Sequence, residues 1–225
     1  LAQAPAKMLA AGFGDLMGKL TAKADWLLSH EINGEAYCSA IQALVDDAVS
    51  QTMALLKANA NGITEDYAAH ILEGLIHSGA AITLVGFSRP ASGAEHHLSH
   101  FWEMEALAGG HTPELHGLKV GYATWLILQV YEQVQARAKK DPLDDSRRKA
   151  LQVAVKHLPT SEEYAQMAAE AGVPLQPERF RMDEGLVRLA LREAMYVRDR
   201  YTILRFADEQ GWLEDIAQAV TIEHV

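Results

Sequence analysis

The chain has 225 residues, of which 49% are hydrophobic, and its 20 Lys and Arg residues face 30 Asp and Glu residues, for a formal net charge of −10. This length and composition allow one large domain or two small ones with a well-buried core. The acidic balance argues against nucleic acid and anionic membrane surfaces as partners, because both attract clustered cations.

Almost every segment has the hydrophobic spacing of an amphipathic helix. Pro5 suits a first helical turn, and Thr64 followed by two acids predicts a helix N-cap. Strand signals are nearly absent, and no repeat or linker divides the chain. We therefore predict one all-α domain over residues 1–225, with helices in chain order over about 5–28, 35–59, 65–85, 93–107, 116–139, 145–157, 161–171 and 183–197 and a terminal pair within 199–221.

Glycines in two places predict close packing between helices. The stretch GFGD at 12–15 lies inside a helical pattern, and Gly117 and Gly121 would let another backbone approach closely. Neither GxGxxG nor GxxxxGK[ST] occurs in the sequence. The chain therefore carries no glycine-rich cradle for a dinucleotide or a nucleotide phosphate.

The number of cysteines and the length of the apolar runs indicate where the protein is located. Cys38 is the single cysteine, which excludes an internal disulfide framework and fits a reducing compartment, so we expect a cytoplasmic protein. No run of 18 apolar residues occurs, so we predict no membrane span. The first residues, LAQAPAKML, lack a signal pattern and an initiator Met, as in a piece of a longer protein.

Three histidines crowd the stretch HHLSH at 96–100. His96 and His100 are four positions apart and share a helix face, while His97 points about 100° away from His96. The spacing resembles the H-E-x-x-H zinc motif, but His97 stands where the general-base Glu would be, which argues against that type of metalloprotease. The alternative is a set of partly buried imidazoles paired with Glu95, Glu103 or Glu105.

Two candidate ligands lie far from this cluster in the sequence. Asp15 stands between glycines on an apolar helix face, where a carboxylate needs a metal or a partner such as Lys19 four residues on. His116 begins a helix directly after a loop, so its ring could turn toward a neighbouring site. His111 in that loop is interpreted as solvated. One carboxylate and two imidazoles suit zinc, iron or nickel with an open coordination position.

Three segments taken together resemble one known family. APAKMLAAGFGDLMGKLTAKADW, SRPASGAEHHLSHFWE and LHGLKVGYAT look like the C-terminal helical domain of the sn-glycerol-1-phosphate dehydrogenases. These enzymes are part of the superfamily of iron-containing and other metal-dependent alcohol dehydrogenases, glycerol dehydrogenases and dehydroquinate synthases. AGFGD would fit glycerol dehydrogenases equally well, whereas SRPASGAEH favours the glycerol-1-phosphate branch. The ending REAMYVRDRYTILRFADEQGWL extends the resemblance over nearly the full chain.

The resemblance implies a metal site. Asp15, His96 and His116 match the family's metal ligands, and Asp15 would also lie against the substrate hydroxyl. His100 matches a histidine that contacts substrate, and it is our candidate for hydrogen bonding the substrate or relaying a proton. His97 matches no ligand of the family and is interpreted as structural.

The resemblance also implies cationic contacts for a substrate phosphate. Dehydroquinate synthases have a substrate-contacting arginine seven residues before the first metal histidine, and Arg89 occupies that position here. Arg89 and Lys19 would supply the donors that a phosphate needs. For Arg89 the alternative is a cation that anchors its loop.

The activity implied is metal-assisted hydride transfer between NAD or NADP and a small phosphorylated polyol, interconverting glycerol 1-phosphate and dihydroxyacetone phosphate. Zinc is the first expectation for the metal, with nickel or iron as alternatives, and a homo-oligomer is expected. The family's N-terminal dinucleotide-binding domain has no counterpart here, so this part alone is expected to be inactive. The alternatives are a glycerol or polyol dehydrogenase, a dehydroquinate synthase-like enzyme, or a non-catalytic helical module.

Overall fold

The computed structural model describes residues 4–58 and 64–224, and within these ranges every regular element is helical. The predicted all-α class is therefore confirmed. The elements are α1 (Ala6–Asn33), α2 (Ser39–Ala58), α3 (Glu65–Val85), α4 (Ala94–Ala108), α5 (His116–Ala138), α6 (Asp145–Val155), α7 (Ser161–Ala171), the 3-10 helix η1 (Pro177–Phe180), α8 (Glu184–Glu193), the 3-10 helix η2 (Ala194–Tyr196), α9 (Ile203–Glu209) and α10 (Leu213–Ala219).

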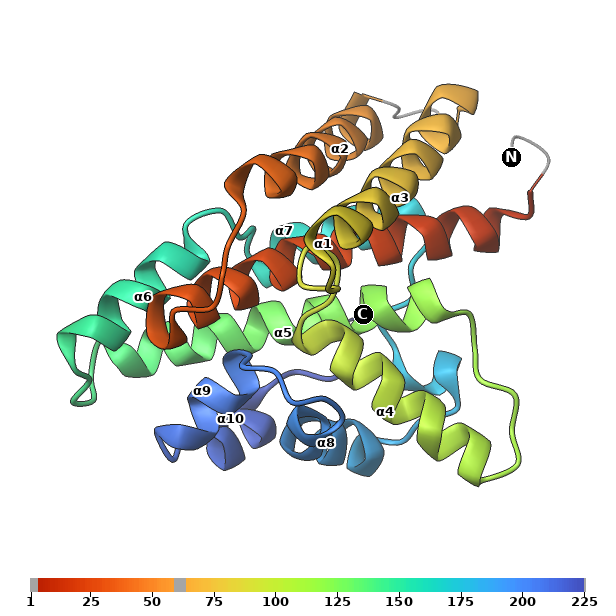
Figure 1. Cartoon of the computed structure of the whole chain (residues 1–225). Coiled ribbons are helices and arrows are strands. Elements are labelled where there is room, and N and C mark those ends of the chain that lie inside the picture. Colours follow the sequence, from red (N-terminus) through yellow and green to blue (C-terminus); the bar gives the residue numbers. More distant parts are fainter. Residues whose placement is uncertain (1–3, 59–63, 225) are drawn as a thin grey trace.

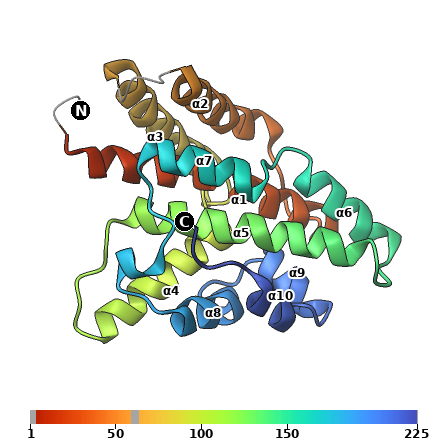
Figure 2. The same ribbon diagram turned by 180° about the vertical axis from the view of Figure 1, so that it is seen from behind.

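The two longest helices, α1 and α5, run side by side through the middle of the molecule and make the most extensive helix contact in it (Figure 1). The α2–α3 pair covers one side of α1. On the other side, α4, α9 and α10 pack against α5, and α8 packs against α4 and α10. Seen from behind, α7 lies along α5, and α6 lies beside the far end of α1 (Figure 2). Both central helices are thus covered on most sides.

Helix ends follow the capping signals of the sequence. The Thr64 side chain accepts a hydrogen bond from the Tyr67 amide at 3.2 Å, as the predicted N-cap requires, and Gly86 ends α3 in a left-handed conformation with φ of 84°. Some predicted bounds were wrong. The first helix ends at Asn33 instead of residue 28, and the second begins at Ser39 instead of residue 35. The segment predicted over 183–197 divides into α8 and η2.

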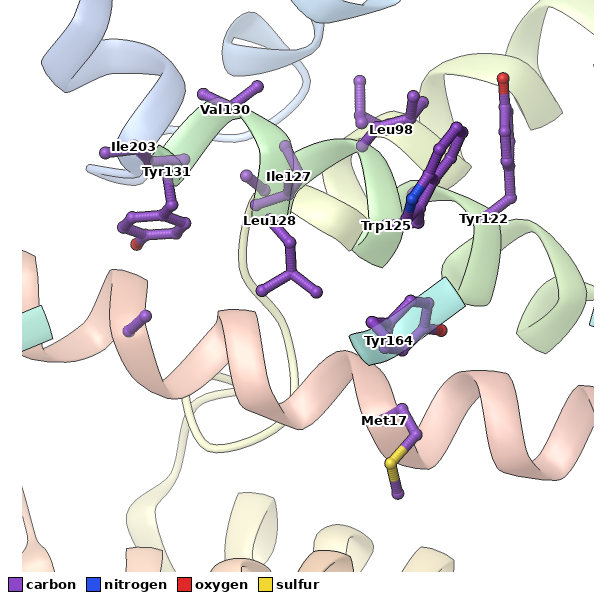
Figure 3. Packing of buried hydrophobic residues seen from close by; sticks show 14 of the residues in the cluster. Met17, Leu98, Tyr122, Trp125, Ile127, Leu128, Val130, Tyr131, Tyr164 and Ile203 are labelled. Atoms are coloured by element: carbon purple, nitrogen blue, oxygen red, sulfur yellow. The ribbon is translucent and has the colours of Figure 1, made fainter. Parts of the chain in front are cut away.

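The core is built around α5, whose side chains are buried nearly all the way round. Figure 3 shows Trp125 reaching toward Leu98 of α4, while Leu128 points toward α1. Tyr122 stacks between Trp102 and Phe180, with ring centroids 5.6 and 5.3 Å away. A helix buried on all sides needs neighbours on all sides, which explains the arrangement of the shorter helices around it.

Glycines bring α1 and α5 into direct backbone contact, as the sequence predicted. A Cβ atom on Gly14 would lie 2.2 Å from the Gly117 carbonyl oxygen, and one on Gly117 would lie 1.9 Å from the Ala11 carbonyl oxygen. The same added atom on Gly117 would lie 3.1 Å from the Cβ of Asp15. This crossing therefore places Asp15 beside the first turn of α5, where His116 begins the helix.

One helix in the described part of the chain, α3, is long and apolar enough to cross a membrane, with a mean hydropathy of 1.3 over its best window. Core helices of proteins that never enter a membrane satisfy the same criterion, so a single such helix is weak support for a span. One face of α3, including Ile71 and Ala81, is buried, whereas Ile76 and Leu84 are exposed. The expectation of no membrane span stays a prediction.

Candidate metal and substrate site

Three side chains from three helices meet beside the glycine crossing, the point where Gly14 of α1 and Gly117 of α5 touch. His96 Nε2 lies 3.3 Å from Asp15 Oδ1, and His116 Nε2 lies 3.9 Å from the same oxygen. One ligand atom from each residue lies within 4.8 Å of the others. The structure therefore brings together the carboxylate and the two imidazoles that the sequence predicted as a metal site.

Carboxylates on the far side of each ring fix which nitrogen faces Asp15. The Nδ1 atom of His96 lies 2.8 Å from Glu95, and the Nδ1 atom of His116 lies 2.9 Å from Glu103. A neutral imidazole that donates from Nδ1 carries its lone pair on Nε2, which is the atom a metal binds. Burial and Lys19 act to lower the pKa of His96, but Asp15 and Glu95 raise it overall, so a metal would displace a proton from this ring. Both rings thus present a ligand atom toward the Asp15 carboxylate.

Glu95 is itself held firmly, because it is fully buried and each of its oxygens has a partner. Its Oε1 accepts a hydrogen bond from the Gly93 amide at 2.7 Å, in addition to the His96 contact. Its Oε2 accepts one from the Thr21 hydroxyl at 2.7 Å. The His96 ring is therefore oriented by a carboxylate that joins α1 to the start of α4.

The electrostatics around Asp15 favour its ionised form. Burial acts to raise the pKa of Asp15, but Lys19, His96 and His116 together hold it well below the usual range. The Lys19 ammonium is 3.3 Å from Asp15 Oδ1, donates to the Ala91 carbonyl oxygen at 3.1 Å and is only 3% exposed. Asp15 therefore pairs with Lys19 and also lies against the two histidines, and its role as a metal ligand stays a prediction.

His100 lies one turn after His96, with its ring centroid 5.4 Å from that of His116. Its Nδ1 is 3.1 Å from Glu103 Oε2, and its Nε2 is 3.3 Å from the guanidinium of Arg198. Burial lowers the pKa of His100, with Glu103 acting to raise it and Arg198 to lower it further. The net direction favours a neutral ring with a proton on Nδ1 and a lone pair on Nε2.

A second group, His100, Glu103 and His116, also has ligand atoms within 4.8 Å of one another. Here the two Nδ1 atoms lie at hydrogen-bond distances from separate oxygens of Glu103, so each ring nitrogen already has a partner. The ammonium of Lys119 lies 3.1 Å from the same carboxylate. We therefore interpret Glu103 as a partner of the two rings and the Asp15 group as the candidate ion site.

Arg89 lies apart from this cluster, in contacts that hold loops together. Its guanidinium donates to both oxygens of Glu35, at 2.8 and 2.5 Å, and to the Tyr201 carbonyl oxygen at 2.8 Å. The side chain is 2% exposed. These contacts are those of an anchoring cation, the alternative noted for this residue, and the phosphate contact of Arg89 stays a prediction.

His97 and His111, the other two histidines considered in the sequence analysis, contribute no ligand atom to either group of candidate ligands found among the described residues. His97 is fully buried, and burial lowers its pKa to about 3. In the part of the chain that the structure describes, neither ring nitrogen of His97 has a hydrogen-bond partner. His111 is exposed in its loop.

Sequence reasoning found some of the supporting residues and missed others. Of the three glutamates considered as histidine partners, Glu95 and Glu103 make that contact, whereas Glu105 is exposed. Lys119 was missed, although its position one turn after His116 on the same helix was a usable signal. Arg198 was missed as well, and its distance from His100 along the chain leaves no local signal.

Sequence comparison identifies relatives of the chain, whereas no protein-family model matches it. A glycerol-1-phosphate dehydrogenase [NAD(P)+] of Bacillus velezensis is 40% identical over 213 residues, covering 95% of this chain and 54% of that protein. A protein of the same name from Halalkalibacterium halodurans is 38% identical over 220 residues, covering 93% of this chain and 54% of that protein. Another from Staphylothermus marinus is 34% identical over 220 residues, covering 96% of this chain and 52% of that protein.

The chain spans about half the length of the curated relatives it matches. The resemblance seen in the motifs is confirmed, and the all-helical fold agrees with a helical domain of that family.

Proposed function

Because the chain is homologous to glycerol-1-phosphate dehydrogenases over nearly its whole length, we propose that it forms the metal- and substrate-binding half of such an enzyme. The proposed reaction is the NAD(P)-dependent interconversion of glycerol 1-phosphate and dihydroxyacetone phosphate, in a cytoplasmic homo-oligomer. The observation that carries the proposal is the meeting of Asp15, His96 and His116, with both imidazoles turned so that Nε2 faces the carboxylate.

Asp15, His96 and His116 would hold one divalent cation. Two imidazole nitrogens and one carboxylate oxygen leave a coordination position open, and this donor set suits zinc first and nickel or iron as well. When bound, the ion would polarise the C2 hydroxyl of glycerol 1-phosphate or the ketone oxygen of dihydroxyacetone phosphate. The low pKa of Asp15 supports this role, since the carboxylate is ionised without any uptake of metal.

His100 would handle the proton of the substrate hydroxyl. Its Nδ1 proton is directed to Glu103, so Nε2 carries the lone pair, which accepts from the Arg198 guanidinium at 3.3 Å; the substrate hydroxyl would take that place as the donor. The lowered pKa of His100 supports a neutral ring that can accept the proton at ordinary pH. The hydride would pass to the nicotinamide of NAD or NADP, the cofactor that the names of the relatives give.

Arg198 is the cation we add to Lys19 and Arg89 as a phosphate contact. It is exposed beside His100 and has no ion pair within residues 4–58 and 64–224. In a preparation of the whole enzyme, Arg198→Ala should raise KM for dihydroxyacetone phosphate about tenfold or more, as for loss of one charged hydrogen bond, with little change in Tm. Arg89→Ala should instead lower Tm, because Glu35 and the Tyr201 carbonyl lose the hydrogen bonds that Arg89 donates. An unchanged KM in Arg198→Ala would remove this assignment.

Metal uptake by the chain itself tests the proposal. The purified protein should bind one zinc ion per chain, measured by elemental analysis and by competition with a chromogenic chelator. Asp15→Asn and His116→Ala should each weaken binding by more than the about 10- to 100-fold that loss of an outer-shell partner costs. His111→Ala is the matched control, because it removes an exposed histidine from the loop before His116.

The proposal fails if the protein takes up no divalent metal, or if both variants bind it as well as the unaltered chain. Substrate tests on the whole enzyme separate the related activities. Oxidation of glycerol without reduction of dihydroxyacetone phosphate would identify a polyol dehydrogenase instead.

A further inference from the structure

We infer that Glu103 is a positioning residue that fixes two rings at once, holding His116 for the metal and His100 for the substrate. The inference rests on the proposed function and deepens it. Glu103 itself would touch neither the ion nor the substrate, so it would act only through the two histidines.

The two histidine contacts of Glu103 go to different oxygens. Oε1 lies 2.9 Å from His116 Nδ1, and Oε2 lies 3.1 Å from His100 Nδ1. Each ring therefore donates to its own oxygen, and neither has to share. A longer contact, 3.3 Å from the Ser99 hydroxyl, adds a weaker second partner to His116 Nδ1.

Glu103 makes these contacts because it lies where two helices meet. On α4 it is three residues after His100, which places both side chains on one face of that helix. His116 approaches from the first position of α5. The carboxylate thus connects the substrate-facing ring of one helix to a candidate metal ligand of the other.

Lys119 holds the carboxylate in this place. Its ammonium lies 3.1 Å from Glu103 Oε1 and also donates to the Glu114 carbonyl oxygen. The Lys119 side chain is only 4% exposed, so this support is shielded from water. Because Lys119 lies one turn after His116 on α5, it fixes Glu103 relative to the ring that Glu103 orients.

The chemical consequence concerns where each ring carries its proton. A neutral imidazole without a partner can carry the proton on either nitrogen, and a proton on Nε2 prevents that atom from binding a metal or accepting from a substrate. An acceptor at both Nδ1 atoms keeps both Nε2 lone pairs free. One carboxylate can do this for two rings, whereas a carboxamide, which has a single oxygen, can do it for only one.

Glu103→Gln is therefore the informative substitution, and Glu105→Gln is its matched control. Glu105 is an exposed carboxylate two residues further along the same helix. With Glu103→Gln we expect zinc binding to weaken about 10- to 100-fold, as for other lost outer-shell partners, and Glu105→Gln should leave it unchanged. Tm measured for both variants shows that the fold is retained.

Nitrogen NMR of the histidine side chains in the metal-free protein tests the inference without any metal. In the unaltered chain both His100 and His116 should carry their proton on Nδ1, and in Glu103→Gln one of them should move it to Nε2 or exchange between the two. Unchanged proton positions in Glu103→Gln would overturn the inference, as would unchanged zinc affinity in a chain that binds zinc. A chain that shows the shifted proton but binds no zinc at all would keep the role of Glu103 and reject the proposed function.

Discussion

Two aspartates of α1, ten positions apart, differ in almost everything except residue type. Asp15 is partly exposed and faces Lys19 and two imidazoles, which lower its pKa. Asp25 is fully buried, and burial together with the nearby Glu95 raises its pKa to about 7. Both lie in an apolar stretch of one helix, so the charges of the neighbours decide which acid stays ionised.

Asp25 joins elements that are far apart in the sequence. Its Oδ1 accepts hydrogen bonds from the Tyr131 hydroxyl at 2.7 Å and the Ile203 amide at 2.8 Å, and its Oδ2 accepts one from the Ala94 amide at 2.7 Å. It thereby ties α1 to α5 and to the first residues of α9 and α4. Because α4 begins at Ala94, the position of His96 depends on this contact.

Removing the two acids should separate a structural role from a binding role. Asp25→Ala leaves three buried donors without an acceptor, at about 1–3 kcal/mol each, so we expect a loss of at least about 3 kcal/mol in the free energy of unfolding. Asp15→Asn keeps an oxygen for Lys19 and should change stability by less than about 1 kcal/mol, the usual scale of a partly exposed ion pair. Urea unfolding of both variants measures the difference, and equal losses would contradict the distinction.

A substitution at the glycine crossing should reduce both stability and zinc binding. A methyl group at Gly117 has no room against the Ala11 carbonyl, so Gly117→Ala forces α1 and α5 apart at a cost of about 3 kcal/mol or more. Zinc binding should weaken as well, because Asp15 moves away from His116. Gly79→Ala is the control: a Cβ there has no neighbour within 4 Å, and alanine in a helix should add up to about 1 kcal/mol of stability. A stable Gly117→Ala variant with normal zinc affinity would show that the crossing is not needed.

The pKa of Asp25 is raised and that of Asp15 is lowered, so their contributions to the free energy of unfolding should change with pH in opposite directions. Asp25 has a folded-state pKa of about 7 against an ordinary 3.8, so its contribution is present below 3.8 and is lost as pH rises through about 7. Within that window the loss is at most about 1.4 kcal/mol per pH unit. Asp15, with a lowered pKa, contributes above 3.8 and loses its contribution as pH falls further.

Unfolding measured from pH 4 to 8 in Asp25→Asn, which stays neutral, should therefore lack the decline that the unaltered chain shows toward pH 7. Asp15→Asn should keep that decline, with a stability difference from the unaltered chain that is nearly constant over this range and shrinks only as pH falls below 3.8. If Asp25→Asn and the unaltered chain respond to pH alike, Asp25 does not titrate in this range.

The sequence was a good guide to the helices and to the residues that meet at the site. Periodicity and caps located α3 and α7 closely, and the motif resemblance singled out Asp15, His96 and His116, although spacing alone could not show that residues so far apart in the chain meet. The sequence analysis did not single out Asp25, because an acidic residue in a helical pattern is interpreted as a surface residue until its hydrogen-bond partners are known. Those partners, Tyr131 and Ile203, lie more than a hundred residues away.

The crossing of α1 and α5 has a mechanical consequence. The contact extends along both helices, from Gly14 and Gly117 at the crossing to the hydrogen bond between the Tyr131 hydroxyl and Asp25. Two rods that touch along their length resist tilting and sliding against each other. The spacing between Asp15 and His116 is therefore set by a stiff pair of helices, so the other helices can adjust around that pair without moving these two side chains apart.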